Sequence, residues 1–189
     1  MEYTLIRSSR KTIAIQIKDG EVIVRAPYRA GEREIRRFVD ANGAWIDKKL
    51  AESAERAKLR QEAIEENGLL TMDEIRRLAN EALRVIPERV KYYAGLLGVN
   101  YGRITIRNQR SKWGSCSAKG NLNFNCLLML TPPEVLDSVV VHELCHRFEM
   151  NHSDRFYARV LSVFPNYYEC SKWLRDNGDV IMGRMSQSE

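Results

Sequence analysis

All three histidines of this 189-residue chain, His142, His146 and His152, fall within eleven consecutive positions, and Glu143 directly follows the first. On an α-helix, residues four positions apart project from the same side, so His142 and His146 can bind one metal ion together. Glu143 would lie about 100° around the helix from His142, close enough to hold a water molecule beside the ion. The pattern His-Glu-x-x-His is therefore typical of a hydrolytic zinc site with two ligands and a general base.

A third protein ligand has to come from beyond this pair. If the helix continued, His152 would lie about 15 Å from His142 along the axis and on another face. Asn151 can end a helix and Ser153 can cap a new one, so the sequence predicts a turn that brings His152 back to the metal. Glu169 is the alternative third ligand. Either choice leaves a fourth position open to water, as in catalytic zinc sites.

Metal binding is favoured because the surrounding helix is apolar on nearly all sides, at Val135, Leu136, Val139, Val140, Val141 and Leu144. Burying imidazoles and a carboxylate there without partners would cost several kcal/mol. Zn²⁺ is the expected ion, although the same ligands also suit Ni²⁺, Co²⁺ and copper. We expect metal-assisted hydrolysis, in which Glu143 takes a proton from water and passes it to the leaving group.

The elements before this helix predict an N-terminal arm over residues 1–68. Residues 12–17 and 22–25 are rich in β-branched residues and flank Lys18-Asp19-Gly20, which is typical of a β-hairpin turn. Residues 4–6 are a candidate third strand. The spacing of apolar residues then predicts two helices, with a break at Asn42-Gly43 and an end at Asn67-Gly68.

Residues 69–189 are expected to form the catalytic domain. Thr71 and Glu74 form a capping box that begins a helix running to about residue 97, with a kink at Pro87. Thr131 is expected to cap the helix that carries the histidines. Period-two patterns and turn residues predict three strands, within 103–107, 112–117 and 121–126.

Several motifs lie outside the zinc pattern, at 110–117 (RSKWGSCS), 121–125 (NLNFN), 151–153 (NHS) and 156–157 (FY). With them the sequence resembles the YgjP-like metal-dependent hydrolases among the zincin metallopeptidases, which are related to WLM and SprT-type proteases. The similarity spans almost the whole chain. It implies an α+β zincin-like domain with a small antiparallel sheet and an active-site helix, in which His142, His146 and His152 hold zinc and Glu143 is the base.

The resemblance also implies that an edge strand beside the active-site helix aligns an extended substrate. By its order in the chain this is strand 121–125, which contains Asn123. Trp113 is expected either in a pocket wall near zinc or in the core, and Arg110 either facing an anion or facing water. Tyr157 is expected either to stabilise an oxyanion or to pack in the core.

The sequence is compatible with three functions. A metallopeptidase is favoured, with peptides as substrates. Residues 101–120 hold five basic and no acidic side chains, so hydrolysis of a small anion such as a nucleoside triphosphate is the alternative. A nucleic-acid-associated protease is the third, although helix 51–66 mixes Glu with Lys and Arg, which is typical of a solvated surface.

Composition places further limits on these functions. The sequence has no run of 18 apolar residues and no basic leader before an apolar stretch, so we expect a cytoplasmic protein without a membrane segment. Its four cysteines do not form the pairs of a disulfide framework or a structural zinc site, and reduced, mostly buried thiols are expected.

Overall fold

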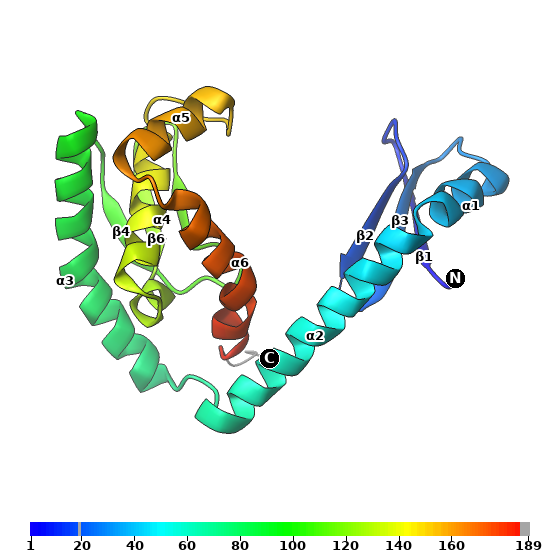
Figure 1. The fold of residues 1–189 in the computed structure, drawn as a ribbon, viewed down its shortest axis with the longest axis horizontal. Helices are drawn as coiled ribbons and strands as arrows, with labels where there is room; N and C mark the ends of the chain where they lie inside the picture. The colour runs from blue at the N-terminus through cyan, green and yellow to red at the C-terminus, as the bar shows by residue number, and fades with distance from the viewer. Residues whose placement is uncertain (19, 186–189) are drawn as a thin grey trace. The chain divides into compact units, whose positions relative to one another are not determined.

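The computed structural model describes residues 1–18 and 20–185 (Figure 1). Contacts along the chain divide it into two compact units, Met1–Glu62 and Ala63–Glu189. Each unit has its own cluster of buried apolar residues. The domain boundary at residue 68 that the sequence suggests stays a prediction.

The first unit contains a three-stranded sheet of β1 (Thr4–Ser8), β2 (Ala14–Lys18) and β3 (Glu21–Pro27). Strand β3 is central, parallel to β1 and antiparallel to β2, so the predicted hairpin and the third strand are both present. Gly20 has the positive φ of 80° that the turn needs. The preceding turn residue, Asp19, lies outside the described residues.

Two helices cover one face of this sheet. Helices α1 (Glu32–Ala41) and α2 (Gly43–Asn67) are separated at Asn42, as the sequence predicts. Alternate residues of β3 are buried, and Val24 forms a core with Ile35 of α1 and Ile46 of α2. Apolar side chains repeat every second residue in the strand and about every 3.6 residues in the helices, so each element turns one apolar face to the same core.

The second unit begins with α3 (Met72–Leu97). The predicted capping box is present, since Glu74 N donates to Thr71 Oγ1 at 3.2 Å and Thr71 N donates to Glu74 Oε2 at 2.8 Å. The helix continues through Pro87 and ends at Gly98, which adopts the left-handed conformation with φ 67°.

The second sheet consists of β4 (Ile104–Arg107), β5 (Gly114–Cys116) and β6 (Leu122–Asn125). Its order is β4-β6-β5, with β6 parallel to β4 and antiparallel to β5, so the sheet is mixed where an antiparallel one was expected. The expectation that 121–125 is an edge strand is wrong. Leu122 and Phe124 are fully buried, and a strand buried this deeply needs backbone partners on both edges. The edge strand that contacts α4 is β5.

The remaining elements are the 3-10 helix η1 (Cys126–Leu130), α4 (Pro133–Cys145), α5 (Asp154–Val163) and α6 (Tyr167–Gly183). Helix α4 lies between α3 and α6 (Figure 1). Its N-cap is Pro132, so the expectation that Thr131 caps it is wrong. The Thr131 hydroxyl donates to Leu128 O at 2.8 Å and so closes η1 instead.

Two expectations from composition can be compared with the structure. All four cysteines are free, and three of them, Cys126, Cys145 and Cys170, are buried, which confirms the prediction of unpaired thiols. Across the described residues, no helix combines the length and the apolar character needed to cross a bilayer.

An ion pair fixes α4 to α3. Asp137 of α4 is buried and accepts hydrogen bonds from Arg89 Nε at 2.6 Å, from Arg89 Nη2 and from the Tyr93 hydroxyl at 3.1 Å. Burial, and then the Asp137 charge, raise the pKa of Tyr93 to about 12, so its hydroxyl stays protonated and can donate. The carboxylate therefore has three donors to offset the cost of its burial.

Replacing this carboxylate should destabilise the second unit. Asp137→Asn keeps the shape but removes the charge that Arg89 and Tyr93 contact, and should lower the free energy of unfolding by about 2 kcal/mol. Urea denaturation measures the change. Asp73→Asn is the matched control, because the Asp73–Arg76 pair is exposed and should contribute less than about 0.5 kcal/mol. Equal effects of the two substitutions would contradict this role for Asp137.

Candidate metal centre

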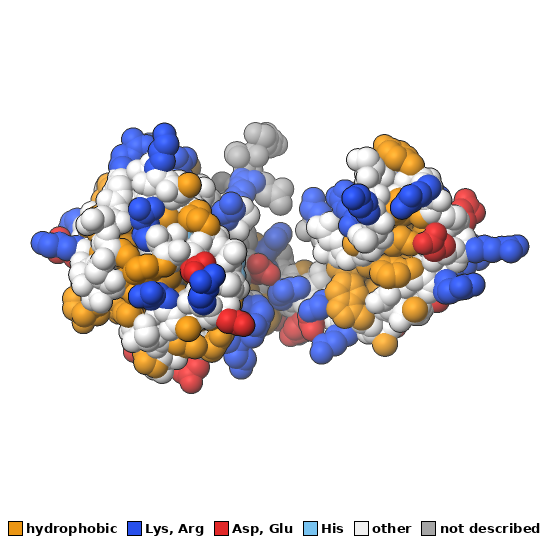
Figure 2. All heavy atoms as spheres, turned by 90° about the horizontal axis from the view of Figure 1, so that it is seen from above, with side chains coloured by type: hydrophobic (Ala, Val, Ile, Leu, Met, Phe, Trp, Pro, Cys, Tyr) orange, Lys and Arg blue, Asp and Glu red, His pale blue; other side chains and the backbone are white. Residues whose placement is uncertain are grey.

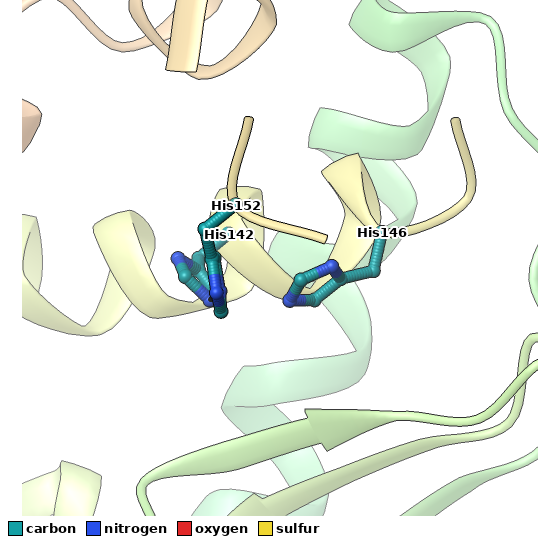
Figure 3. A group of neighbouring side chains, drawn as sticks. All are labelled: His142, His146 and His152. Atoms are coloured by element: carbon teal, nitrogen blue, oxygen red, sulfur yellow. Dashed lines mark hydrogen bonds between the residues drawn. The ribbon is translucent and has the colours of Figure 1, made fainter. Parts of the chain in front are cut away.

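The end of α4 determines where the histidines lie. The helix ends at Cys145 with His146 as its C-cap, several residues before the end expected from the sequence. Arg147 N and Phe148 N donate to Leu144 O at 2.9 Å and Cys145 O at 3.0 Å, so the chain turns at once. As predicted, Ser153 is the next N-cap, and its hydroxyl accepts from Phe156 N at 3.4 Å. Between these ends the chain doubles back and returns His152 to α4 (Figure 3).

The three imidazoles share one small volume. One ring nitrogen from each of His142, His146 and His152 lies within 4.8 Å of the others, and the Nε2 atoms of His142 and His152 are 3.1 Å apart. Two nitrogen ligands at about 2.0–2.1 Å from one tetrahedral ion would be about 3.3 Å apart. The donor set therefore fits a divalent ion with three nitrogen ligands and one open position.

The second nitrogen of two rings is already bonded. His146 Nδ1 lies 3.0 Å from Glu149 O, and a carbonyl only accepts, so Nδ1 carries the hydrogen and Nε2 keeps a free lone pair. His142 Nδ1 is 2.8 Å from the Tyr167 hydroxyl. Contacts of this kind orient metal-binding histidines. Sequence reasoning missed Tyr167, which lies 25 residues from its partner.

Phe156 forms an apolar support for the three rings. It is fully buried, and its ring centroid lies 4.9, 4.7 and 5.0 Å from those of His142, His146 and His152. Burial, and then the neighbouring imidazoles, lower the pKa of His142 to about 3, and burial also lowers the pKa of His146. The His142 and His146 rings are therefore neutral near neutral pH, which is the form that binds metals.

The alternative third ligand does not join this group. Glu169 is exposed on α6, and the group of ligand atoms within 4.8 Å contains the three histidines and no carboxylate among the described residues. The candidate ligands are therefore His142, His146 and His152.

Glu143 lies beside the imidazoles, in contact with the edge strand. It is only 5% exposed, and its burial raises its pKa to about 8, while nearby Lys112 acts in the opposite direction. A Cβ atom on Gly114 of β5 would lie 2.7 Å from Glu143 Oε1 and 2.8 Å from Cγ. Only glycine at this position leaves room for the carboxylate. Sequence reasoning missed this contact.

A cavity of about 170 Å³ opens beside Glu143 and His142. Residues of α4 and α6 line it, among them Tyr167, and Trp113 forms part of its wall, so we name it the α4–α6 cavity. Trp113 therefore lies beside the candidate site, in the position of a pocket wall.

The other residues singled out in the sequence lie in different surroundings. Tyr157 is partly buried, with its ring centroid 6.2 Å from that of His152. Asn123 bonds Arg107 Nε at 3.1 Å and Ser115 Oγ at 3.2 Å within the sheet. Arg110 is exposed, and neither it nor Asn123 is among the described residues that line the cavity. The structure thus brings Trp113 and Tyr157 near the candidate site, while Arg110 and Asn123 do not line its cavity.

Comparisons with known proteins match this chain to one family and to two solved structures. A family described as YgjP-like, metallopeptidase domain, matches residues 11–78 and 71–177. The metallopeptidase zymogen of Pyrococcus abyssi, abylysin, is 20% identical, with a TM-score of 0.44 over 48% of this chain and 93% of that chain. The metallopeptidase zymogen of Methanocaldococcus jannaschii, jannalysin, is 22% identical, with a TM-score of 0.44 over 50% and 97%. No curated protein shows significant similarity.

Metal titrations can test the ligand set. Calorimetry with Zn²⁺ should show one ion per chain, with the affinity reduced about 10- to 100-fold in Tyr167→Phe, because His142 loses its hydrogen-bond partner. His152→Ala should weaken binding further, since it removes a ligand. Glu169→Ala is the control and should bind as the unaltered chain does. A loss in Glu169→Ala equal to that in His152→Ala would contradict the assignment.

Proposed function

The chain belongs to the YgjP-like metallopeptidase family, and on this premise we propose that it is a metal-dependent peptidase with Glu143 as its general base. The observation that supports this most directly is the convergence of three ring nitrogens within 4.8 Å, beside the buried Glu143 carboxylate of α4. Zn²⁺ is the proposed ion, because three imidazoles and one open position are typical of catalytic zinc. When bound there, the ion would polarise the carbonyl of the substrate and make a water molecule more acidic.

Glu143 is proposed to carry the proton during hydrolysis. As a carboxylate it accepts a proton from the attacking water, and as a carboxylic acid it donates that proton to the amine that leaves. Its position against Gly114 keeps the carboxylate beside the imidazoles. His142 and His146 cannot take over this role, because one nitrogen of each is bonded to Tyr167 or Glu149 and the other faces the ion site.

A peptide is the proposed substrate because the edge strand beside Glu143 can align one. Trp113 O accepts a hydrogen bond from Asn125 N, and Ser117 N donates one to Asn121 O. The backbone polar groups of Trp113, Ser115 and Ser117 therefore face β6. Gly114 and Cys116 then direct their backbone N–H and C=O groups away from β6. An extended peptide can add to this edge as a further strand, with its scissile bond near Glu143.

The alternative substrates fit the structure less well. A nucleoside triphosphate needs basic side chains around the reacting phosphate, yet none of the described residues lining the α4–α6 cavity is Lys or Arg. On the face shown in Figure 2, Lys and Arg side chains are spread over both units with acidic side chains among them. A protein that tracks nucleic-acid phosphates would gather them in one stripe.

Peptide hydrolysis should depend on Glu143. Zinc-loaded protein is expected to cleave members of a peptide library, and Glu143→Gln should lower kcat/KM by at least about 100-fold, the usual contribution of a general base. Mass spectrometry of the products measures cleavage, and metal analysis should show the same zinc content in both proteins. The absence of any Glu143-dependent cleavage would overturn the proposed function.

Glycine at position 114 should be needed for activity and not for metal binding. Gly114→Ala places a methyl group where the Glu143 carboxylate lies and should reduce kcat about 100-fold, the usual cost of a displacement of about 1 Å. Gly95→Ala is the matched control, because its Cβ would meet nothing within 4 Å. Full activity of Gly114→Ala would show that Glu143 does not depend on this contact.

A further inference from the structure

The edge strand β5 is held to the histidine helix at both of its ends. At one end, Gly114 packs against the Glu143 carboxylate. At the other end, the side chain of Arg147 lies against the turn that joins β5 to β6. Arg147 directly follows His146, the C-cap of α4, which keeps helical backbone angles. Four residues along a helix span about 6 Å, close to the roughly 6.6 Å between every second residue of a strand, so the two contacts match the spacing of both elements.

The guanidinium of Arg147 joins two backbone segments to the end of α4. Its Nε donates to Asn100 O at 3.0 Å, in the segment before β4, and its Nη1 donates to Ala118 O at 3.4 Å, in the turn after β5. A Cβ atom on Gly120 would lie 2.8 Å from Cζ and 2.9 Å from both Nε and Nη1, so the flat group is stacked on this glycine. A planar, forked set of donors is what arginine provides and lysine does not.

The thiol of Cys116 lies between the two contacts. Cys116 is two residues after Gly114, so both project from the same face of β5. Burial, and then the charge of Glu143, raise the pKa of this thiol, whereas Arg147 acts in the opposite direction. One side chain of β5 therefore interacts with both side chains from the end of α4, which indicates that strand and helix lie alongside each other here.

We propose that Arg147 is a positioning residue that determines which bond of a peptide is cleaved, because it holds β5 in one position beside Glu143. The inference rests on the proposed peptidase function. A peptide added to β5 takes its place from the backbone groups of Gly114 and Cys116. Pairing with β6 fixes β5 within the sheet and leaves the distance from the sheet to α4 to contacts such as those of Arg147. Without them, a neighbouring bond of the same peptide could meet the carboxylate.

The bonds cleaved in one peptide test this role. A library peptide that the unaltered chain cleaves at a single bond is incubated with Arg147→Ala, and mass spectrometry identifies the products. We expect kcat for that bond to fall about 100-fold, the usual cost of a displacement of about 1 Å, and products of the neighbouring bonds to appear. KM should change little, because the edge of β5 remains free to bind a peptide. A loss of folded protein would lower kcat without creating new products.

Two control substitutions and one rescue accompany this variant. Arg84→Ala, at an exposed position of α3, should leave both kcat and the cleaved bond unchanged. Arg147→Lys keeps the charge and should still give the new products, because an ammonium group cannot span the two carbonyls that the guanidinium joins. Asn100→Ala keeps the backbone carbonyl that Arg147 contacts and should behave as the unaltered chain does.

Gly120→Ala tests the same contact from the opposite side. Its methyl group would displace the guanidinium without removing the charge, so the same new products are expected. Gly20→Ala is the matched control, because Gly20 has the same φ of 80° and its Cβ would meet nothing within 4 Å. The double variant Arg147→Ala/Gly120→Ala should give the product pattern of Arg147→Ala, since two changes at one contact are not additive.

The outcomes separate this inference from the function on which it rests. Zinc content is measured in every variant and should be equal, since Tyr167 and the Glu149 carbonyl still orient the rings on α4. Cleavage at the same single bond by Arg147→Ala and Gly120→Ala, whether kcat is unchanged or reduced, would overturn the role of Arg147 and leave the peptidase standing. Equal cleavage of several neighbouring bonds by the unaltered chain would do the same. No cleavage of any peptide by the zinc-loaded chain would overturn both.

Discussion

The structure depends on placing two imidazoles and a carboxylate on the apolar helix α4, and a third imidazole beside them, without leaving them unpaired. Ten residues of α4 are buried, among them Glu143. Each imidazole on α4 uses one nitrogen for a contact inside the protein, to Tyr167 or to the Glu149 carbonyl, and directs the other to a shared point. The free lone pairs of the rings are directed to that point, so an ion bound there would offset the desolvation of the whole group.

This arrangement requires that α4 stay fixed while its neighbours supply the missing parts. Asp137 ties it to α3 through Arg89, while α6 provides Tyr167 and α5 provides Phe156. The candidate ligand His152 comes from the short turn between α4 and α5, so the candidate metal site lies where three separate helices meet. Small movements of any one would change distances that have to hold within a few tenths of an ångström.

The sequence predicted the features that depend on neighbouring residues and missed those that depend on distant ones. The His142–His146 pair, the Ser153 cap and the Thr71 capping box follow from helical spacing, and all three are present as expected. The order of the second sheet depends on which strand is buried on both sides, and spacing alone does not reveal that. Thr131 could cap the end of η1 or the start of α4. The local sequence pattern favoured α4, whereas the hydroxyl of Thr131 bonds within η1.

The contact between Gly114 and Glu143 joins the parts of the proposed mechanism. The edge strand that can align a peptide is the same strand that touches the carboxylate, and its neighbour Trp113 borders the α4–α6 cavity. A peptide added to β5 would therefore bring its backbone to Glu143. Binding energy from the backbone contacts along β5 would then hold the scissile bond in position for attack, which is how contacts away from the reacting atoms raise a rate.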